Sequence, residues 1–169
     1  MALEQLLFYL FAAGGILSAL LVVTRRNPII SVICLIVNFF CLAGLYLTLH
    51  AQFIAVIQIL VYAGAIMVLF VFVIMLLNLG DERRLRDGFS WKKGIAGGFG
   101  LGVLMELIYI IMMHTASQPI DADRATDIGT VEAIGQVLFT HFLFPFEVTS
   151  LLLTAAIVGA VILAKKKID

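Results

Sequence analysis

Residues 53–77 form a run of about 25 residues without a charged side chain, and this run limits the possible folds more than any other feature. An apolar helix of about 20 residues is long enough to cross the hydrocarbon core of a bilayer. Because lipid offers no hydrogen bonds to the backbone, only helices and closed barrels span membranes. The run is continuous rather than alternating, which argues against a strand. We therefore expect a transmembrane helix here.

Composition extends this interpretation to the whole chain. The 169 residues are 63% hydrophobic and 13% charged, whereas soluble domains are about 45–50% apolar and about 25% charged. A soluble fold of this size leaves too much of its chain exposed to hide so much apolar surface. The net charge is zero, so the chain has no overall electric field that would attract a charged partner such as a nucleic acid. A soluble enzyme, a disordered chain and a nucleic-acid-binding protein are thereby excluded. We predict an all-α, polytopic membrane protein, a single domain of residues 1–169, with five transmembrane helices at 6–24, 29–49, 53–77, 94–114 and 146–164.

The basic residues predict an orientation. Every lysine and arginine except Arg124 follows the first, third or fifth apolar run, which places them on one side of the membrane. Basic loops stay in the cytoplasm, so the N-terminus is predicted outside and the C-terminus in the cytoplasm. Four or six spans would scatter the same charges over both sides.

The connections between the runs are mostly short. Pro28 is placed where a helix N-terminus tolerates proline, and His50 begins a link of about three residues that predicts a tight hairpin of spans two and three. The long connection before the last span ends in apolar residues at helical spacing, which predicts a short interfacial helix. Its apolar stripe consists of Val131, Ile134, Val137, Leu138 and Phe142.

The cysteines and histidines predict no metal or cofactor site. Cys34 and Cys41 are seven residues apart on one predicted helix, roughly 10 Å by helical rise, which is too far for a disulfide. Helix packing is the simpler role for both. The three histidines lie near span ends and form no ligand pair, so we expect this chain to bind no metal, haem or iron–sulfur cluster itself.

Polar residues inside the third span permit two interpretations. Gln58 and Tyr62 are four residues apart and share a helix face, and Gly64 follows two residues later. Glycine and β-branched neighbours weaken helical preference, which favours a π-bulge, a turn containing one extra residue. Small and polar residues also serve close helix packing, and composition alone does not decide between the two roles.

Carboxylates are the other intramembrane candidates. Glu106 is well inside the fourth span and must be neutral, paired or beside a water-filled cavity, so a proton relay and an interchain hydrogen bond are both open. Glu147 lies near the start of the fifth span, where the helix dipole favours a negative charge without any chemistry. Asn38 is expected to form an interhelical hydrogen bond. Glycines at 94, 98 and 102 predict close approach of another helix.

Residues 58–77 resemble the third helix of subunit J of bacterial NADH-quinone oxidoreductase, respiratory complex I, whose mitochondrial counterpart is subunit 6. Two further regions agree with that family: Asn27-Pro28 with Ser31, and the segments 134–140, 143–147 and 150–153. The resemblance covers nearly the whole chain.

The resemblance implies a non-catalytic membrane-arm subunit of a proton-translocating NADH:quinone oxidoreductase, multi-pass in the bacterial plasma membrane. It implies partners equivalent to subunits H, A, K and N, and FMN, iron–sulfur clusters and quinone on other subunits. In the family, helix 3 switches between π-bulged and α-helical windings. The implied gate consists of Gln58, of the hinge residues Tyr62 and Gly64, and of an apolar plug formed by Met67, Val68 and Phe70. Gln58 is neutral where some relatives carry a carboxylate, so the position itself is not expected to carry a proton.

Two other functions fit the same residues. A multisubunit cation/proton antiporter or a membrane-bound hydrogenase contains related chains, and the same hinge would serve there without NADH. A static scaffold would keep the third span in one winding. The chains that co-purify and the water accessibility of position 68 distinguish these alternatives.

Overall fold

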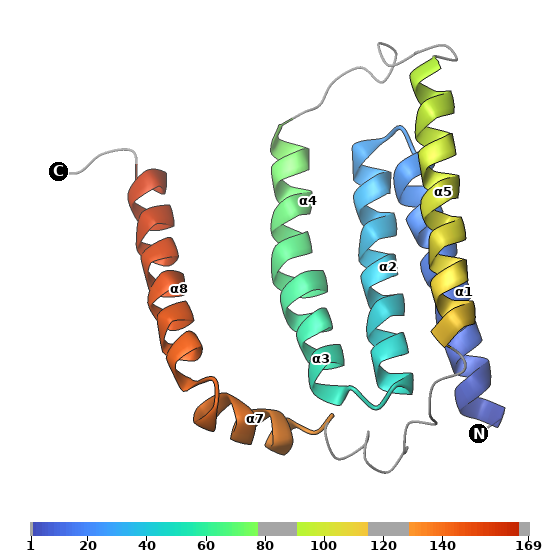
Figure 1. Cartoon of the computed structure of the whole chain (residues 1–169). Coiled ribbons are helices and arrows are strands. Elements are labelled where there is room, and N and C mark those ends of the chain that lie inside the picture. The colour runs from blue at the N-terminus through green and yellow to red at the C-terminus, as the bar shows by residue number, and fades with distance from the viewer. Residues whose placement is uncertain (1, 78–90, 115–128, 166–169) are drawn as a thin grey trace.

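The computed structural model describes residues 2–77, 91–114 and 129–165, and all regular elements among them are helices (Figure 1). The order follows the predicted spans, except that the third span is divided into three windings. The elements are α1 (Ala2–Thr24), α2 (Pro28–Thr48), α3 (Gln52–Ile57), η1 (Gln58–Ile66), α4 (Met67–Leu76), α5 (Trp91–His114), α7 (Val131–Thr140) and α8 (Leu143–Ala164).

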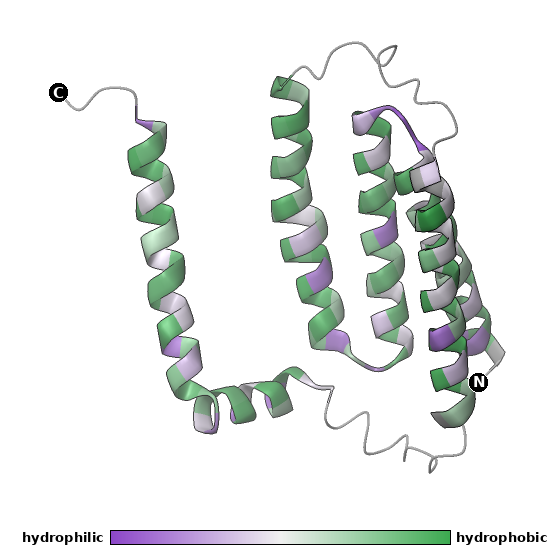
Figure 2. Ribbon diagram, turned by 45° about the horizontal axis from the view of Figure 1, so that its top comes forward, coloured by the Kyte–Doolittle hydropathy of each residue, from purple (hydrophilic) through white to green (hydrophobic). Residues whose placement is uncertain are grey.

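The five predicted transmembrane helices are confirmed. Five helical stretches are long and apolar enough to cross a membrane, at Leu3–Thr24, Pro28–Thr48, Gln52–Leu76, Gly94–Met113 and Leu143–Ala164. Figure 2 shows that apolar residues predominate along these helices, as expected where the surroundings are lipid or other apolar helices. The short helix α7 confirms the predicted helix before the last span. The predicted orientation across the membrane stays a prediction.

The first five elements form a bundle in which α2 lies between α1 and the third span (Figure 1). The turn between α1 and α2 is short because Asn27 caps α2: its side-chain oxygen accepts from the backbone N–H groups of Ile29 and Ile30 at 2.9 and 3.3 Å. Ser31 donates to the carbonyl of Val22 at 2.6 Å, which ties the two helices at this end.

The interface of α1 with α2 depends on small residues. A Cβ added at Gly44 would lie 2.7 Å from the Phe11 ring, and one at Gly14 would lie 3.1 Å from the Cys41 sulfur. Asn38 donates to the carbonyl of Gly15 at 2.7 Å, so the predicted interhelical hydrogen bond is confirmed. Cys41 packs in this interface, and both cysteines are free, as predicted.

The turn between α2 and α3 is as tight as predicted. His50 adopts a left-handed conformation with φ of 60°, while the Ala51 N–H donates to the Tyr46 carbonyl at 2.9 Å and the His50 N–H to that of Leu47 at 3.1 Å. This is the Schellman pattern that ends many helices, with histidine in the position where glycine is usual. The turn places α3 antiparallel to α2.

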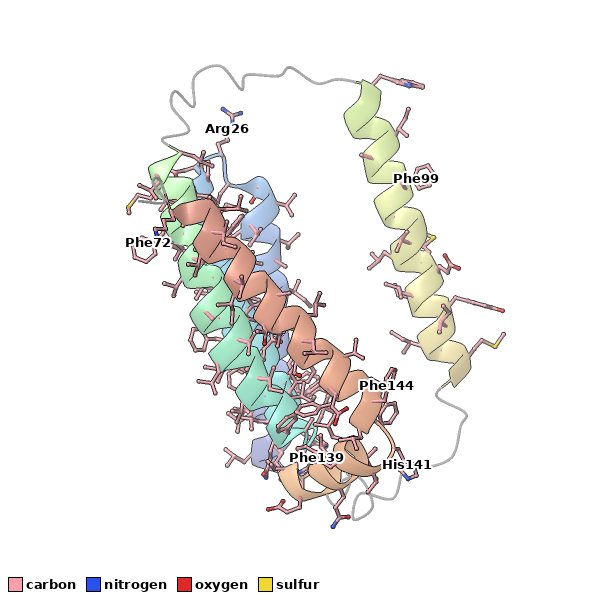
Figure 3. The ribbon with its side chains drawn as sticks, turned by 90° about the vertical axis from the view of Figure 1, so that its left-hand side faces the viewer. Arg26, Phe72, Phe99, Phe139, His141 and Phe144 are labelled. Carbon is pink, nitrogen blue, oxygen red and sulfur yellow. The ribbon has the colours of Figure 1, made fainter. Side chains whose placement is uncertain are left out.

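Helices α5 and α8 lie outside this bundle. Figure 1 shows α8 apart from α1–α4, and Figure 3, from the side, shows α5 apart from them as well. Among the described helices, α5 makes no extensive contact, while the extensive contact of α7 is with α8, where the Phe139 and Phe146 rings meet edge to face at 5.3 Å. The large faces of α5 and α8 are therefore open to surfaces that the other described helices do not supply.

Candidate functional site

The third span changes its winding at the polar residues that the sequence singles out. Between α3 and α4, the nine residues of η1 wind as a π-helix from Gln58 to Ile66. At its end the Met67 N–H donates to the carbonyl of Tyr62, five residues back, as well as to that of Gly64. A π-turn holds one more residue than an α-turn, so of the two interpretations left open by the sequence, the third span adopts the π-winding that the family resemblance implies.

Burial along the third span shows the effect of the extra residue. The buried residues are Ala55, Gln58, Ala63 and Met67, each no more than 8% exposed. Residues on one face of an α-helix are three or four apart, but Gln58 and Ala63 are five apart. The π-winding therefore lets the buried residues of both α3 and α4 face α2, although the segment between these two helices is one residue longer than an α-helix would need.

Gly64 has a specific reason to be glycine in this winding. A Cβ at this position would lie 3.2 Å from the carbonyl oxygen of Ile59, five residues back, which is closer than side chains normally approach a backbone oxygen. In the interior of an ordinary α-helix, by contrast, alanine is favoured over glycine by about 1 kcal/mol. The π-winding at this position thus favours a residue with no side chain.

Tyr62 is held by an aromatic contact with α2. Its ring meets the Phe39 ring at 5.8 Å between centroids and 61° between planes, an edge-to-face arrangement. Tyr62 is nevertheless 45% exposed, whereas Gln58, one turn earlier, is buried. The two polar side chains predicted to share a face are therefore separated by the π-winding: Gln58 faces the bundle and Tyr62 lies at its edge.

The predicted apolar plug is not gathered on one face. Met67 is buried, while Val68 and Phe70 are exposed. The candidate carboxylates lie outside the bundle, with Glu106 on α5 and Glu147 just past the first turn of α8. The structure brings Gln58, Tyr62, Gly64 and Met67 together in the third span, and it leaves both carboxylates on helices that do not pack against that span.

Two residues in the bundle were not identified from the sequence. Phe39 contacts Tyr62, and Ser18 is buried and accepts from Asn38 at 3.1 Å. Both lie on neighbouring helices, and a contact between helices leaves no spacing signal in a single sequence. In the described part of the chain, no three histidine, cysteine or carboxylate side chains gather as ligands for a metal ion.

The family is decided by a comparison over most of the chain. Residues 18–163, from the second half of α1 to the end of α8, match the family model described as NADH-ubiquinone/plastoquinone oxidoreductase chain 6. The chain belongs to this family. Members of the family are subunits of multisubunit NADH-quinone oxidoreductases, respiratory complex I, so other subunits of such a complex are its partners. The five spans make it a multi-pass membrane protein.

Individual relatives agree along nearly the full length. Subunit J of NADH-quinone oxidoreductase from Rickettsia bellii is 34% identical over 166 residues, covering 96% of this chain and 80% of the relative. Subunit 6 of the NAD(P)H-quinone oxidoreductase in the organellar chromatophore of Paulinella chromatophora is 37% identical, with coverages of 98% and 80%. Subunit J of the F(420)H(2) dehydrogenase of Methanosarcina mazei is 35% identical, with coverages of 97% and 92%.

Proposed function

We propose that this chain is a non-catalytic subunit of a proton-translocating NADH:quinone oxidoreductase, in which the third span acts as a gate that couples quinone chemistry to proton movement. The observation that carries this proposal is the π-winding of η1 in a helix that is otherwise α-helical. FMN, the iron–sulfur clusters and the quinone site belong to other subunits. The neighbours are equivalents of subunits H, A, K and N, in a bacterial plasma membrane.

The gate works by a change of register. If η1 rewinds as an α-helix while α3 keeps its place, the residue four after Gln58 faces α2, and that residue is Tyr62 in place of Ala63. Removing one residue from a turn rotates everything that follows by roughly 100°. The Phe39–Tyr62 contact and the burial of Ala63 and Met67 favour the π-register. The gap between the registers must be small enough for chemistry elsewhere in the complex to reverse it.

The rotation carries the apolar plug with it. Met67, Val68 and Phe70 follow the π-turn directly, so all three move together when the register changes. Water chains form only where the surroundings are polar or roomy enough, and rotating bulky apolar side chains into or out of a path dries or wets it. Gln58 and Tyr62 supply the polar groups beside which water is stable.

The test is the water accessibility of one position during turnover. Val68→Cys, in a background of Cys34→Ala and Cys41→Ala, is labelled with a water-soluble maleimide in the resting complex and during NADH oxidation. We expect the labelling rate to change with turnover. Val56→Cys is the matched control, because Val56 is exposed on α3, before the π-turn, and does not rotate. Equal rates at position 68 in both conditions would leave the third span a static scaffold.

A second candidate function has support from one relative. The similarity to a subunit of the F(420)H(2) dehydrogenase of Methanosarcina mazei places members of this family in a complex with a different electron donor. The same gate in the third span would work in such a complex, and in a membrane-bound hydrogenase or a cation/proton antiporter, because any electron donor is bound by other chains. Purification of the assembled complex in mild detergent, followed by identification of its chains and of the donor it oxidises, separates these complexes.

A further inference from the structure

Glu106 is an intramembrane carboxylate without a partner in the described part of this chain. It lies in α5, about 18 Å along the helix from Gly94 and about 10 Å from Met113, the two ends of the apolar stretch. Its carboxylate forms no hydrogen bond or ion pair with residues 2–77, 91–114 or 129–165. The five apolar stretches of the chain contain no lysine or arginine. The five described apolar stretches therefore supply no cation that could neutralise Glu106 inside the membrane.

A groove on α5 leads to this carboxylate. It has a volume of about 460 Å³ and is lined by Gly98, Phe99, Gly102, Val103 and Glu106. Gly98, Gly102 and Glu106 are four residues apart and share one face, and the two glycines have no neighbouring atom within 4 Å of a hypothetical Cβ. A helix that docks here can come close to the α5 backbone while a long side chain reaches Glu106.

The groove faces away from the bundle of α1–α4. Figure 3 shows Phe99, one of its lining residues, on the side of α5 opposite to α1–α4. The described helices of this chain therefore leave the groove open, and α5 makes no extensive contact with any of them. The family belongs to multisubunit membrane complexes, so other transmembrane helices are present to fill it.

We propose that the α5 groove receives a transmembrane helix of another subunit, and that this helix presents a lysine or arginine side chain at the depth of Glu106. Charges within a bilayer occur almost always in pairs or beside water, and a cation opposite Glu106 satisfies this rule for both groups. Lysine and arginine also have the length to reach across a helix interface. This inference rests on membership in the complex and is independent of the gate in the third span.

Photo-crosslinking in the assembled complex tests the occupant. Phe99→p-benzoylphenylalanine places a probe of similar shape in the groove, and Leu104→p-benzoylphenylalanine is the control, because Leu104 lies on the opposite side of α5 by helical geometry and is also exposed. After illumination in native membranes, we expect the probe at 99 to attach to another subunit. The attached peptide should lie in a transmembrane helix with a lysine or arginine within about one turn of the depth of Glu106. Attachment to lipid only, to a second copy of this chain, or to a helix without such a residue would overturn the proposal.

A charge exchange tests the ion pair itself. Glu106→Lys places two cations together and should reduce the amount of chain recovered with the complex about tenfold or more, because unpaired charges in an interface are strongly unfavourable. Replacing the cation on the crosslinked helix with glutamate should restore recovery in the Glu106→Lys background. Glu106→Gln in the same membranes is the uncharged comparison and should give an intermediate loss. Normal recovery of Glu106→Lys, or no restoration by the exchange, would contradict the ion pair.

Discussion

Gly64→Ala separates the two windings of the third span by the smallest available change. In the π-register the new methyl group would lie 3.2 Å from the Ile59 carbonyl oxygen. Overpacking of this kind costs about 1–3 kcal/mol, whereas alanine fits an α-helix without strain. A shift of 1–3 kcal/mol changes a two-state ratio by a factor of about 5–150, so the ratio of the α-helical register to the π-register should rise by that factor.

Two measurements check this shift. Labelling of Val68→Cys with a water-soluble maleimide in the resting complex should change about fivefold or more when Gly64→Ala is added, because the ratio of registers changes by that much. In inverted membrane vesicles, quinone reduction, proton uptake or both should fall while the amount of assembled complex stays normal. A larger side chain, in Gly64→Val, should have a stronger effect in the same direction.

Gly97→Ala is the control for this experiment. Gly97 lies in α5 with no atom within 4 Å of a hypothetical Cβ, so the substitution adds the same methyl group to a helix without crowding. It should leave turnover and labelling at position 68 unchanged. If Gly64→Ala behaves like Gly97→Ala in both assays, the π-winding has no part in coupling, and the gate is refuted.

Three further substitutions test the contacts around the site. Phe39→Leu removes the ring that meets Tyr62 and should shift labelling at position 68 in the same direction as Gly64→Ala, since an aromatic pair contributes about 0.5–1.5 kcal/mol. Phe39→Trp keeps an aromatic ring and should label nearly as the chain with phenylalanine does. Equal labelling with phenylalanine, leucine and tryptophan at position 39 would show that the contact does not hold the register. Gly44→Leu places a side chain where a Cβ alone would be 2.7 Å from the Phe11 ring. Because such overpacking prevents α1 from packing on α2, immunoblots of membranes should show loss of the chain. Normal amounts of the chain would contradict the tight packing of these two helices. His50→Gly relieves the strain of a left-handed residue. It should raise the thermal midpoint of the complex, measured by loss of activity on heating, or leave it unchanged. A lower midpoint would mean that the imidazole makes a contact in the complex.

The spans could be predicted because each is a continuous apolar run, and the cost of placing backbone or charge in lipid leaves few alternatives. Their ends were predicted within a few residues. The last span begins at Leu143 rather than at residue 146, because Pro145 is tolerated in the first turn of a helix. The residues alone left the winding of the third span open between a π-bulge and close packing, and the family resemblance was needed to favour the π-turn near Gly64.

The contacts between helices could not be predicted in the same way. The edge-to-face pair of Phe39 with Tyr62 joins residues on two helices, and nothing in the sequence distinguishes Phe39 from the other phenylalanines of the chain. The separation of Gln58 from Tyr62 onto different sides also required the structure, because the spacing of four predicts a shared face only for α-winding. The open face of α5 depends on where whole helices lie, which local patterns do not determine.

The step of five between the buried residues Gln58 and Ala63 means that the third helix carries a surplus residue. A chain shortened by one residue between these two positions would present the same buried side chains to α2 as an ordinary α-helix. Such a chain would lack any second arrangement to adopt, yet it would retain the faces with which it packs. The length of this helix therefore separates what the subunit needs in order to fit its complex from what it needs in order to move within it.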